Sequence, residues 1–205
     1  TVGGDGTFLQ AASHLTDQYI LGVNSDSGRS VGKFCAAAEK NFEEIFQRIL
    51  SGELKSKTLP RFSLQVDGNS KKFLILNDIL VCDINPGAMS RYELAVGGVQ
   101  EEQRSSGLWV STASGSTGAM RSSGGVRLRE TSEKIQYRPR ELYYRRENQY
   151  RLTGKVLSLD KPLKIRSLMR KGVIYTDGAH AKYPFTYGNV AIVRHSSIPI
   201  KTFTA

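Results

Sequence analysis

The first 55 residues carry apolar positions at helical spacing in two segments, separated by a short apolar run. The first segment, at 7–15, predicts a short helix, and Thr7 followed by Gln10 fits a capping box at its start. The run at 19–23 predicts a buried parallel strand. The apolar face of the helix predicted at 7–15 consists of Phe8, Leu9, Ala12 and Leu15.

The second segment, at 41–52, predicts another helix, with Asn41 as a plausible N-cap and Gly52 as a C-terminal stop. Glu43 and Glu44 lie in its first turn, where negative charge is favourable. These elements give the N-terminal part an α/β character. The apolar stripe of the second helix is formed by Phe42, Ile45, Phe46 and Ile49.

After Lys55 the pattern changes to alternation, which is typical of strands. FSLQV, DGNS and KKFLILNDILV predict a hairpin with an Asp-Gly turn, and RYELAV, GG and VQEEQR predict a second hairpin. One helix is expected to begin near Thr117. The remainder is therefore mostly β. Further strand-like runs are KVLSL, LKIRSL, GVIYTDG and VAIVRH.

The composition fits a folded protein of one compact domain or two small ones, because 39% of its 205 residues are hydrophobic. No apolar stretch approaches the roughly 18 residues of a transmembrane helix, and no signal-peptide pattern is visible. Cys35 and Cys82 follow no metal-binding or disulfide spacing and are expected to be buried thiols. This suits a reducing compartment, so we expect a cytoplasmic protein without a membrane partner.

The net charge of +10 favours anionic partners, among them nucleic acids, membrane surfaces and phosphorylated small molecules. Tyr and Arg interleave between Tyr137 and Leu152, and Arg with aromatic side chains can stack on bases. A solvated loop next to a strand edge explains the same segment. No helix-turn-helix, zinc-finger or RNP-type pattern accompanies it, so we expect no nucleic-acid partner.

The turn GGDGT, at 3–7, places a carboxylate where the backbone suits a phosphate. Asp5 would repel that phosphate unless it does chemistry, either by accepting a proton from an attacking hydroxyl or by holding the metal of a polyphosphate. The alternative is that Asp5 only caps the helix. The candidate nucleotide-binding residues of the turn are Gly3, Gly4, Gly6 and Thr7.

Two further segments are candidate binding sites. Asn77 and Asp78 interrupt an apolar strand, and a ribose diol or an adenine edge could partner them, although a structural turn or a satisfied polar network is the alternative. The run from Ser111 to Gly125 is rich in serine, threonine and glycine and leads towards a helix, so it offers N–H and O–H donors to a phosphate or a carboxamide.

Together and in this order, the three motifs resemble the NAD kinase family: GGDGT at 3–7, the Asn-acid pair at 77–78 and SGLWVSTASGSTGAM at 106–120. The first motif is shared with lipid kinases of the diacylglycerol-kinase superfamily, whereas the third is specific to NAD kinases. The resemblance covers nearly the whole chain. Supporting stretches are LGVNSD (21–26), IQYRPREL (135–142) and DGAHAKYPFTYGNVAIVRHSSIP (177–199).

The resemblance implies an α/β plus β fold, an NAD-kinase-like two-domain architecture with a truncated N-terminal α/β domain and a β-rich C-terminal domain. The first domain would occupy 1–55, the β-rich dinucleotide-binding domain 56–190, and a segment at 191–205 would return to the first domain. Family members normally have a strand, a helix and another strand before GGDGT. Thr1 and Val2 would then be only the end of that last strand.

The implied activity is phosphorylation of the adenosine 2′-hydroxyl of NAD or NADH, with ATP or another polyphosphate as donor. Mg²⁺ or another divalent cation would accompany the donor, with no dedicated protein metal site. In the family, the GGDGT Asp is the base for the 2′-hydroxyl, the Asn-acid pair contacts the adenosine, and hydroxyls after the GS turn line the pocket. These roles would fall on Asp5, on Asn77 and Asp78, and on Thr117 and Ser122. Homo-oligomers are common in the family.

Two departures bear on redox preference. The family often has Asp where this chain has Ser106, and Tyr where it has Ala119, and both usually line the dinucleotide pocket. These differences resemble a divergent branch that includes plant NADH kinases. Two alternatives stay open from the sequence: a lipid kinase that shares only GGDGT, and a non-catalytic dinucleotide-binding protein.

Overall fold

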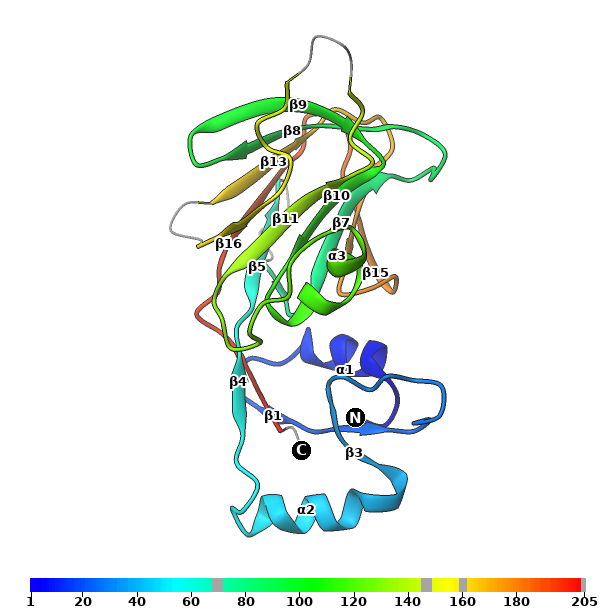
Figure 1. Cartoon of the computed structure of the whole chain (residues 1–205), viewed down its shortest axis with the longest axis vertical. Helices are drawn as coiled ribbons and strands as arrows, with labels where there is room; N and C mark the ends of the chain where they lie inside the picture. The colour runs from blue at the N-terminus through cyan, green and yellow to red at the C-terminus, as the bar shows by residue number, and fades with distance from the viewer. Residues whose placement is uncertain (68–71, 145–148, 159–161, 204–205) are drawn as a thin grey trace. The chain divides into compact units, whose positions relative to one another are not determined.

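The protein is described here by a computed structural model that covers residues 1–67, 72–144, 149–158 and 162–203. It divides into two compact units, and each is treated by itself (Figure 1). Unit 1 comprises Thr1–Leu59 and Ile198–Ala205, and unit 2 comprises Pro60–Ser197. The predicted boundaries at 55 and 190 lie before these divisions, because strand pairing keeps residues 57–59 in unit 1 and residues 190–195 in unit 2.

Unit 1 is a small α/β unit with two short sheets. One sheet has the order β1-β17-β4, and β2 and β3 form the other as a parallel pair. Val2 bridges to Val23 in parallel, so three chain segments run side by side up to the glycine turn. The elements are α1 (Asp5–Ala12), β1 (Tyr19–Ile20), β2 (Gly22–Asn24), β3 (Cys35–Ala38), the 3-10 helix η1 (Glu39–Asn41), α2 (Phe42–Leu50), β4 (Lys57–Leu59) and β17 (Ile200–Thr202).

Both predicted helices of unit 1 are confirmed, with corrections at their starts. The capping box at Thr7 and Gln10 is wrong, because α1 begins at Asp5 and its N-cap is Gly4. Asn41 precedes α2 as predicted, but its side-chain oxygen accepts the Ala38 N–H (2.7 Å) instead of an N–H within the helix. The backbone turns back at the end of α2, where Gly52 adopts a φ of 76°.

The predicted strand at 19–23 is parallel, but it is divided. Residues 19–20 form β1 and pair with β17, whereas β2 begins at Gly22 and pairs with β3. The stripe of α2 is also divided, since Ile45 is buried while Phe42 and Phe46, whose rings stack on each other, are each about two-fifths exposed. Unit 1 therefore leaves large apolar side chains of α2 at its surface.

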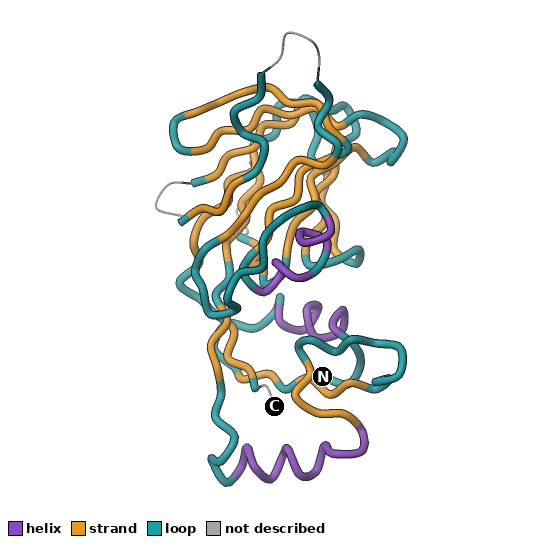
Figure 2. The backbone as a smooth tube through the Cα atoms, viewed as in Figure 1, coloured by secondary structure: helices purple, strands orange, loops and turns teal. Residues whose placement is uncertain are grey.

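Unit 2 is built from strands, as Figure 2 shows in orange, and forms two six-stranded sheets. One sheet has the order β12-β11-β10-β7-β14-β15, and the other has the order β6-β5-β16-β13-β8-β9. Among the described residues, the strand pairs of both sheets are antiparallel. The strands are β5 (Phe62–Val66), β6 (Phe73–Ile75), β7 (Asp78–Asp83), β8 (Ser90–Val96), β9 (Val99–Ser105), β10 (Gly107–Ser111), β11 (Ile135–Arg140), β12 (Lys155–Leu157), β13 (Leu163–Ser167), β14 (Gly172–Thr176), β15 (Ala181–Pro184) and β16 (Val190–His195).

The core of unit 2 lies between these sheets, because buried apolar residues from both sheets form one cluster. Alternate residues of each strand face it, as the alternating pattern predicts. Burial of this apolar surface is the main stabilising contribution to the unit. Members of the cluster include Phe62, Leu64, Ile79, Val81, Tyr92, Leu94, Leu108, Val110, Ile165, Ile174, Phe185 and Val193.

The hairpin of β8 and β9 is confirmed, with Val96 opposite Val99. Its turn residues Gly97 and Gly98 have φ values of 58° and 87°, as a type I′ turn requires. The hairpin of β5 and β6 also forms, but the Gly68 part of its predicted Asp-Gly turn lies outside the described residues.

The segment KKFLILNDILV was predicted to be one strand, but in the structure it forms two. β6 ends at Ile75 and β7 begins at Asp78, and the two strands belong to different sheets. The polar residues of this segment therefore lie at a passage from one sheet to the other, where ladder hydrogen bonds are interrupted.

Three strands of unit 2 were not predicted, namely β10, β11 and β15. β11 takes up the first part of the Tyr- and Arg-rich segment, of which residues 145–148 lie outside the described residues. Near the helix expected at Thr117 there are two short elements, η2 (Ser114–Thr117) and α3 (Ala119–Ser122). None of the helices among the described residues combines the length and the apolar character needed to cross a bilayer.

Candidate functional site

The glycine turn, residues Gly3–Thr7, joins the Val2 bridge to α1. Gly3 donates its N–H to the Val23 carbonyl (2.9 Å), and its own carbonyl accepts the Ser25 N–H (3.4 Å). A Cβ atom on Gly3 would collide with the Thr7 side chain, and Gly3 has a φ of 154°. A Cβ atom on Gly4 would lie 2.8 Å from Ser30 Oγ. Glycine is therefore favoured at Gly3 by both its φ and its contacts, whereas a side chain at Gly4 would require only the Ser30 hydroxyl to move.

Asp5 is the first residue of α1, and its side chain is held from outside the helix. Its Oδ1 accepts the backbone N–H of Phe34 at 2.8 Å, from a loop 29 residues along the chain. Because the N-cap position belongs to Gly4, the carboxylate does not fill the capping role considered for it from the sequence. Asp5 is half-buried, and its partner gives the carboxylate a defined orientation.

Cys35 lies beside the same turn. Its Sγ donates to the Gly3 carbonyl at 3.7 Å, and burial followed by the nearby Asp5 carboxylate raises the pKa of the thiol. Cys35 and Cys82 are both free and half-buried, so they are less buried than predicted. Burial also raises the pKa of the Cys82 thiol. Both side chains are consequently weak nucleophiles at neutral pH.

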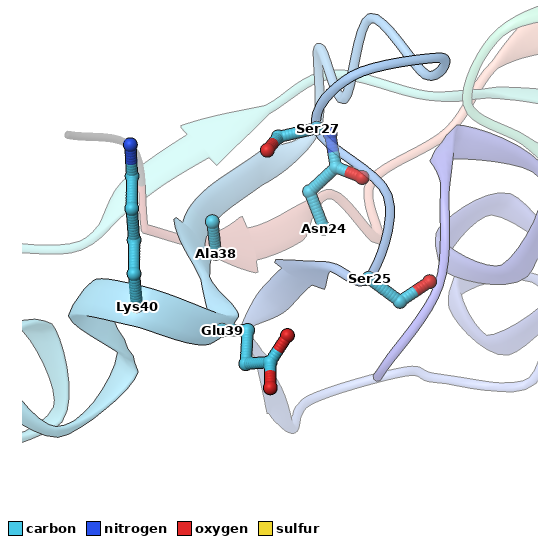
Figure 3. A pocket seen from close by; sticks show the side chains of 6 residues that line it. All are labelled: Asn24, Ser25, Ser27, Ala38, Glu39 and Lys40. Atoms are coloured by element: carbon cyan, nitrogen blue, oxygen red, sulfur yellow. The ribbon is translucent and has the colours of Figure 1, made fainter.

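An open cavity of about 440 Å³ lies at the carboxyl ends of β2 and β3 (Figure 3). This edge of parallel strands is where α/β folds commonly bind ligands. Asn24 in its wall is buried and already engaged, since Nδ2 donates to the Ser30 carbonyl (3.2 Å) and Oδ1 accepts the Asp26 N–H (3.1 Å). The sequence did not indicate this cavity. Its lining is Asn24, Ser25, Ser27, Ala38, Glu39 and Lys40.

The Asn77–Asp78 pair lies in unit 2 at the passage from β6 to β7. Asn77 Nδ2 donates to Asp78 Oδ2 at 3.0 Å, so the two side chains bond to each other. Asp78 is buried while Asn77 is partly exposed. Burial, and then the neighbouring Asp177 carboxylate, raise the pKa of Asp78 to about 7. Near neutral pH the Asp78 carboxyl is therefore partly protonated.

Asp177, which the sequence analysis did not single out, is the main partner of this pair. Burial raises the pKa of Asp177 to about 6, against the opposing effects of three backbone N–H donors and the buried Arg61 guanidinium. The pKa of Arg61 is itself lowered to about 10 by burial, an effect that Asp177 partly offsets. Asp177 adopts a left-handed backbone with a φ of 49°. The Asp-Gly sequence at 177–178 was the available signal, since both residues tolerate that conformation.

The small-residue run from Ser111 to Gly125 is brought against the pair. Gly115 packs on Asn77 so closely that a Cβ atom would overlap the Asn77 carbonyl oxygen. Ser111 stands opposite Asp78 across β10 and β7. Thr117 and Ser122, two of the predicted binding residues, are exposed hydroxyl side chains on η2 and α3. The first part of the run therefore supports the pair, and the later part displays hydroxyls to solvent.

The structure places Ser106 away from the Asn77–Asp78 pair. It lies between β9 and β10, where its N–H donates to the Arg140 carbonyl at 3.0 Å. The pair meets the far end of β10, at Ser111, so the five-residue strand separates them by about 17 Å at the usual rise per residue. Any effect of Ser106 on a ligand would consequently concern a different part of that ligand.

The described residues include no cluster of three or more His, Cys, Asp or Glu side chains that could hold a metal ion. Mg²⁺ in phosphate-transfer sites is commonly bound by one or two carboxylates together with substrate phosphates. That requirement fits Asp5, the single carboxylate of the glycine turn. An ion at this turn would therefore take most of its ligands from the phosphate donor and water.

Comparisons with known proteins give the affiliation of the chain. No protein-family model matches it. It is 33% identical over 211 residues to a probable NADH kinase of Oryza sativa subsp. japonica, with 92% of this chain and 65% of that protein covered. It is 30% identical over 228 residues to an NADH kinase of Arabidopsis thaliana, with 99% and 71% covered.

A solved NAD kinase structure from Archaeoglobus fulgidus, in complex with ATP, matches with a TM-score of 0.80 and 27% identity. The match covers 99% of this chain and 76% of that one. The chain thus spans about two thirds to three quarters of the length of these relatives. The sequence similarity to the plant proteins, the fold and the three motifs all indicate the same family. The chain therefore belongs to the NAD kinase family.

Proposed function

We propose that this protein is an NAD(H) kinase, which transfers a phosphoryl group from ATP or another polyphosphate to the adenosine 2′-hydroxyl of NAD or NADH. The observation that carries the proposal is the Asp5 carboxylate, held by the Phe34 N–H at the start of a helix in a turn that otherwise suits phosphate. A carboxylate oriented in this way is suited to accept a proton.

In this reaction Asp5 orients the 2′-hydroxyl and takes its proton as the oxygen attacks the terminal phosphorus of the donor. The bond from that phosphorus to its bridging oxygen breaks, and the nucleoside diphosphate or shortened polyphosphate leaves. Phosphoryl transfer depends mainly on positioning and electrostatic stabilisation, and the oriented base and the backbone turn would supply part of both. A divalent cation, when bound, neutralises charge on the donor phosphates.

The Asn77–Asp78 pair is proposed to bind the adenosine. The amide of Asn77 and the carboxyl of Asp78 can donate to and accept from a ribose diol or an adenine edge. Thr117 and Ser122 supply exposed hydroxyls for the rest of the dinucleotide, and the Gly3, Gly4, Gly6 and Thr7 backbone is assigned to the phosphates. Ser106 is proposed to influence the choice between NAD and NADH.

We also propose a cytoplasmic homo-oligomer. The two free thiols suit a reducing compartment. Size-exclusion chromatography with light scattering tests the oligomeric state, and a mass equal to that of one chain would contradict it.

The test is the formation of NADP or NADPH from NAD or NADH, each supplied with ATP or polyphosphate and Mg²⁺. We expect turnover with at least one dinucleotide and none with diacylglycerol as acceptor. Phosphorylation of the lipid alone would support a lipid kinase instead. Binding of NAD in calorimetry without product formation would support a non-catalytic dinucleotide-binding protein.

A further inference from the structure

Leu76 and Asn77 lie outside the strand ladders, where the backbone passes from one sheet to the other, and Asp78 is the first residue of β7. The N–H groups of these three residues are bound by one carboxylate. Asp177 accepts the N–H of Leu76 (3.0 Å), of Asn77 (2.7 Å) and of Asp78 (3.2 Å). Asp177 also returns a bond, since its own N–H donates to the Asp78 carbonyl at 2.8 Å. All three N–H groups of the passage are thereby satisfied.

Thr112 completes the acceptor side. Its hydroxyl donates to the Leu76 carbonyl at 2.5 Å, and its backbone N–H donates to the Asn77 carbonyl at 3.0 Å. The hydroxyl oxygen also accepts the Gly115 N–H at 3.1 Å, which links the passage to the small-residue run. Every N–H and C=O group of residues 76–78 is then paired, and Thr112 and Asp177 supply all of these bonds.

Thr112 is buried, and Asp177 takes up an uncommon left-handed backbone to reach its three donors. Residues in such conformations persist where the surroundings hold them, and they gather at functional sites. The backbone needs nothing from the side chains of Asn77 and Asp78, which bond to each other at 3.0 Å. Asn77 is partly exposed, so a ligand can reach the pair from that side.

We propose that Thr112 and Asp177 are positioning residues that hold the Asn77–Asp78 pair in the orientation that binds the adenosine of the dinucleotide. The inference rests on the proposed function, and it adds two residues that touch the pair and not the substrate. Binding groups must be held to within a fraction of an ångström, so removing the hydrogen bonds of either Thr112 or Asp177 should weaken dinucleotide binding.

The test uses Thr112→Val, which keeps the shape and removes the hydroxyl. We expect the KM for the dinucleotide to rise about tenfold, the kcat to stay within about threefold, and the KM for ATP to stay unchanged; a tenfold change corresponds to about 1.4 kcal/mol. Thr112→Ser, which restores the hydroxyl, should recover most of the loss. Asp177→Asn should act in the same direction, with a lower Tm.

Ser167→Ala is the matched control. The Ser167 hydroxyl is buried in the same unit, donates to the Phe185 carbonyl (2.7 Å) and accepts the Met169 N–H (3.2 Å), which parallels the bonds of Thr112. This variant should lower the Tm without changing the KM for the dinucleotide. If Thr112→Val behaves like it, or changes both KM values equally, Thr112 is only structural and the proposal is overturned.

A direct titration separates this proposal from the proposed kinase activity. The dissociation constant of NADH, followed by its fluorescence, should rise about tenfold in Thr112→Val even if the wild-type chain forms no NADPH. That result would contradict the kinase activity and keep the positioning role. An unchanged dissociation constant, or a wild-type chain that does not bind NADH, overturns the positioning role.

Discussion

The glycine turn of unit 1 and the Asn77–Asp78 pair of unit 2 differ in how many bonds they receive from residues far along the chain. Asp5 is oriented by one backbone N–H from a loop 29 residues away, and the neighbouring glycines belong to the motif itself. The pair is held by Thr112 and Asp177, which lie 36 and 101 residues from Leu76 along the chain. The carboxylate of the turn is thus oriented by one distant residue, whereas the backbone of the pair is bonded to two.

The two units also differ in their apolar clusters and in the apolar side chains that they leave exposed. In unit 2 a buried cluster between two six-stranded sheets supports the pair. The apolar core cluster around Ile45 in unit 1 is small, and the rings of Phe42 and Phe46 remain partly exposed. Substitutions can test this contrast for chemistry and for stability.

The largest effect is expected for Asp5→Asn, which removes the proposed base and keeps the size of the side chain. We expect kcat to fall by about 10²–10⁴-fold, the range for loss of a general base, with dinucleotide affinity nearly unchanged. Steady-state kinetics and calorimetry measure the two quantities. The control is Asp26→Asn, an exposed acid in the following loop, which should behave as wild type. A loss below threefold would remove Asp5 from the chemistry.

The next effect concerns stability. Leu94 is fully buried between the sheets of unit 2, so Leu94→Ala should lower the free energy of unfolding by about 2–5 kcal/mol. Phe46, with about two-fifths of its surface exposed in unit 1, should cost less when changed to Ala. Urea unfolding followed by amide hydrogen exchange in each unit tests the order. Equal losses would show that exposure does not distinguish the two units.

A smaller effect is expected from pH, and it should arise in unit 2. The folded chain holds the Asp78 proton up to about pH 7, whereas an unfolded Asp loses it near pH 4. Between these values the folded state binds more protons, so its stability falls as the pH rises, by up to about 1.4 kcal/mol per pH unit and proton. Asp78→Asn should flatten this dependence, leaving the part that comes from Asp177. A slope equal to that of wild type would contradict the assignment.

The smallest effect is expected at Ser106, which belongs to neither region. NAD carries a positive nicotinamide ring and NADH a neutral one, so a pocket carboxylate would favour NAD. With Ser106 uncharged, we expect NADH to be used at least as well as NAD. Ser106→Asp should shift the ratio of the two kcat/KM values towards NAD by about tenfold, or about 1.4 kcal/mol. A wild-type preference for NAD above tenfold, or an unchanged ratio in the variant, would show that Ser106 does not determine this choice.

Much of the fold was accessible from the sequence where the signal is local. Helical spacing located α1 and α2, and the Gly97–Gly98 turn located the β8–β9 hairpin, because periodicity and turn chemistry act within a few residues. The apolar run through Asn77 was misread as one strand for the same reason. No pattern within the run indicates that β6 and β7 belong to different sheets.

The same distinction between local and non-local signals applies to the candidate site. Asp5, its glycines and the polar pair at 77–78 could be proposed from the sequence alone, since each is an unusual residue type in its immediate surroundings. The sequence could not show that Phe34 orients Asp5, that Thr112 and Asp177 bond to the backbone of residues 76–78, or that Ser106 lies at the other end of β10 from the pair. Unsatisfied peptide groups must find partners wherever the fold brings donors and acceptors close, and distance along the chain does not limit that choice.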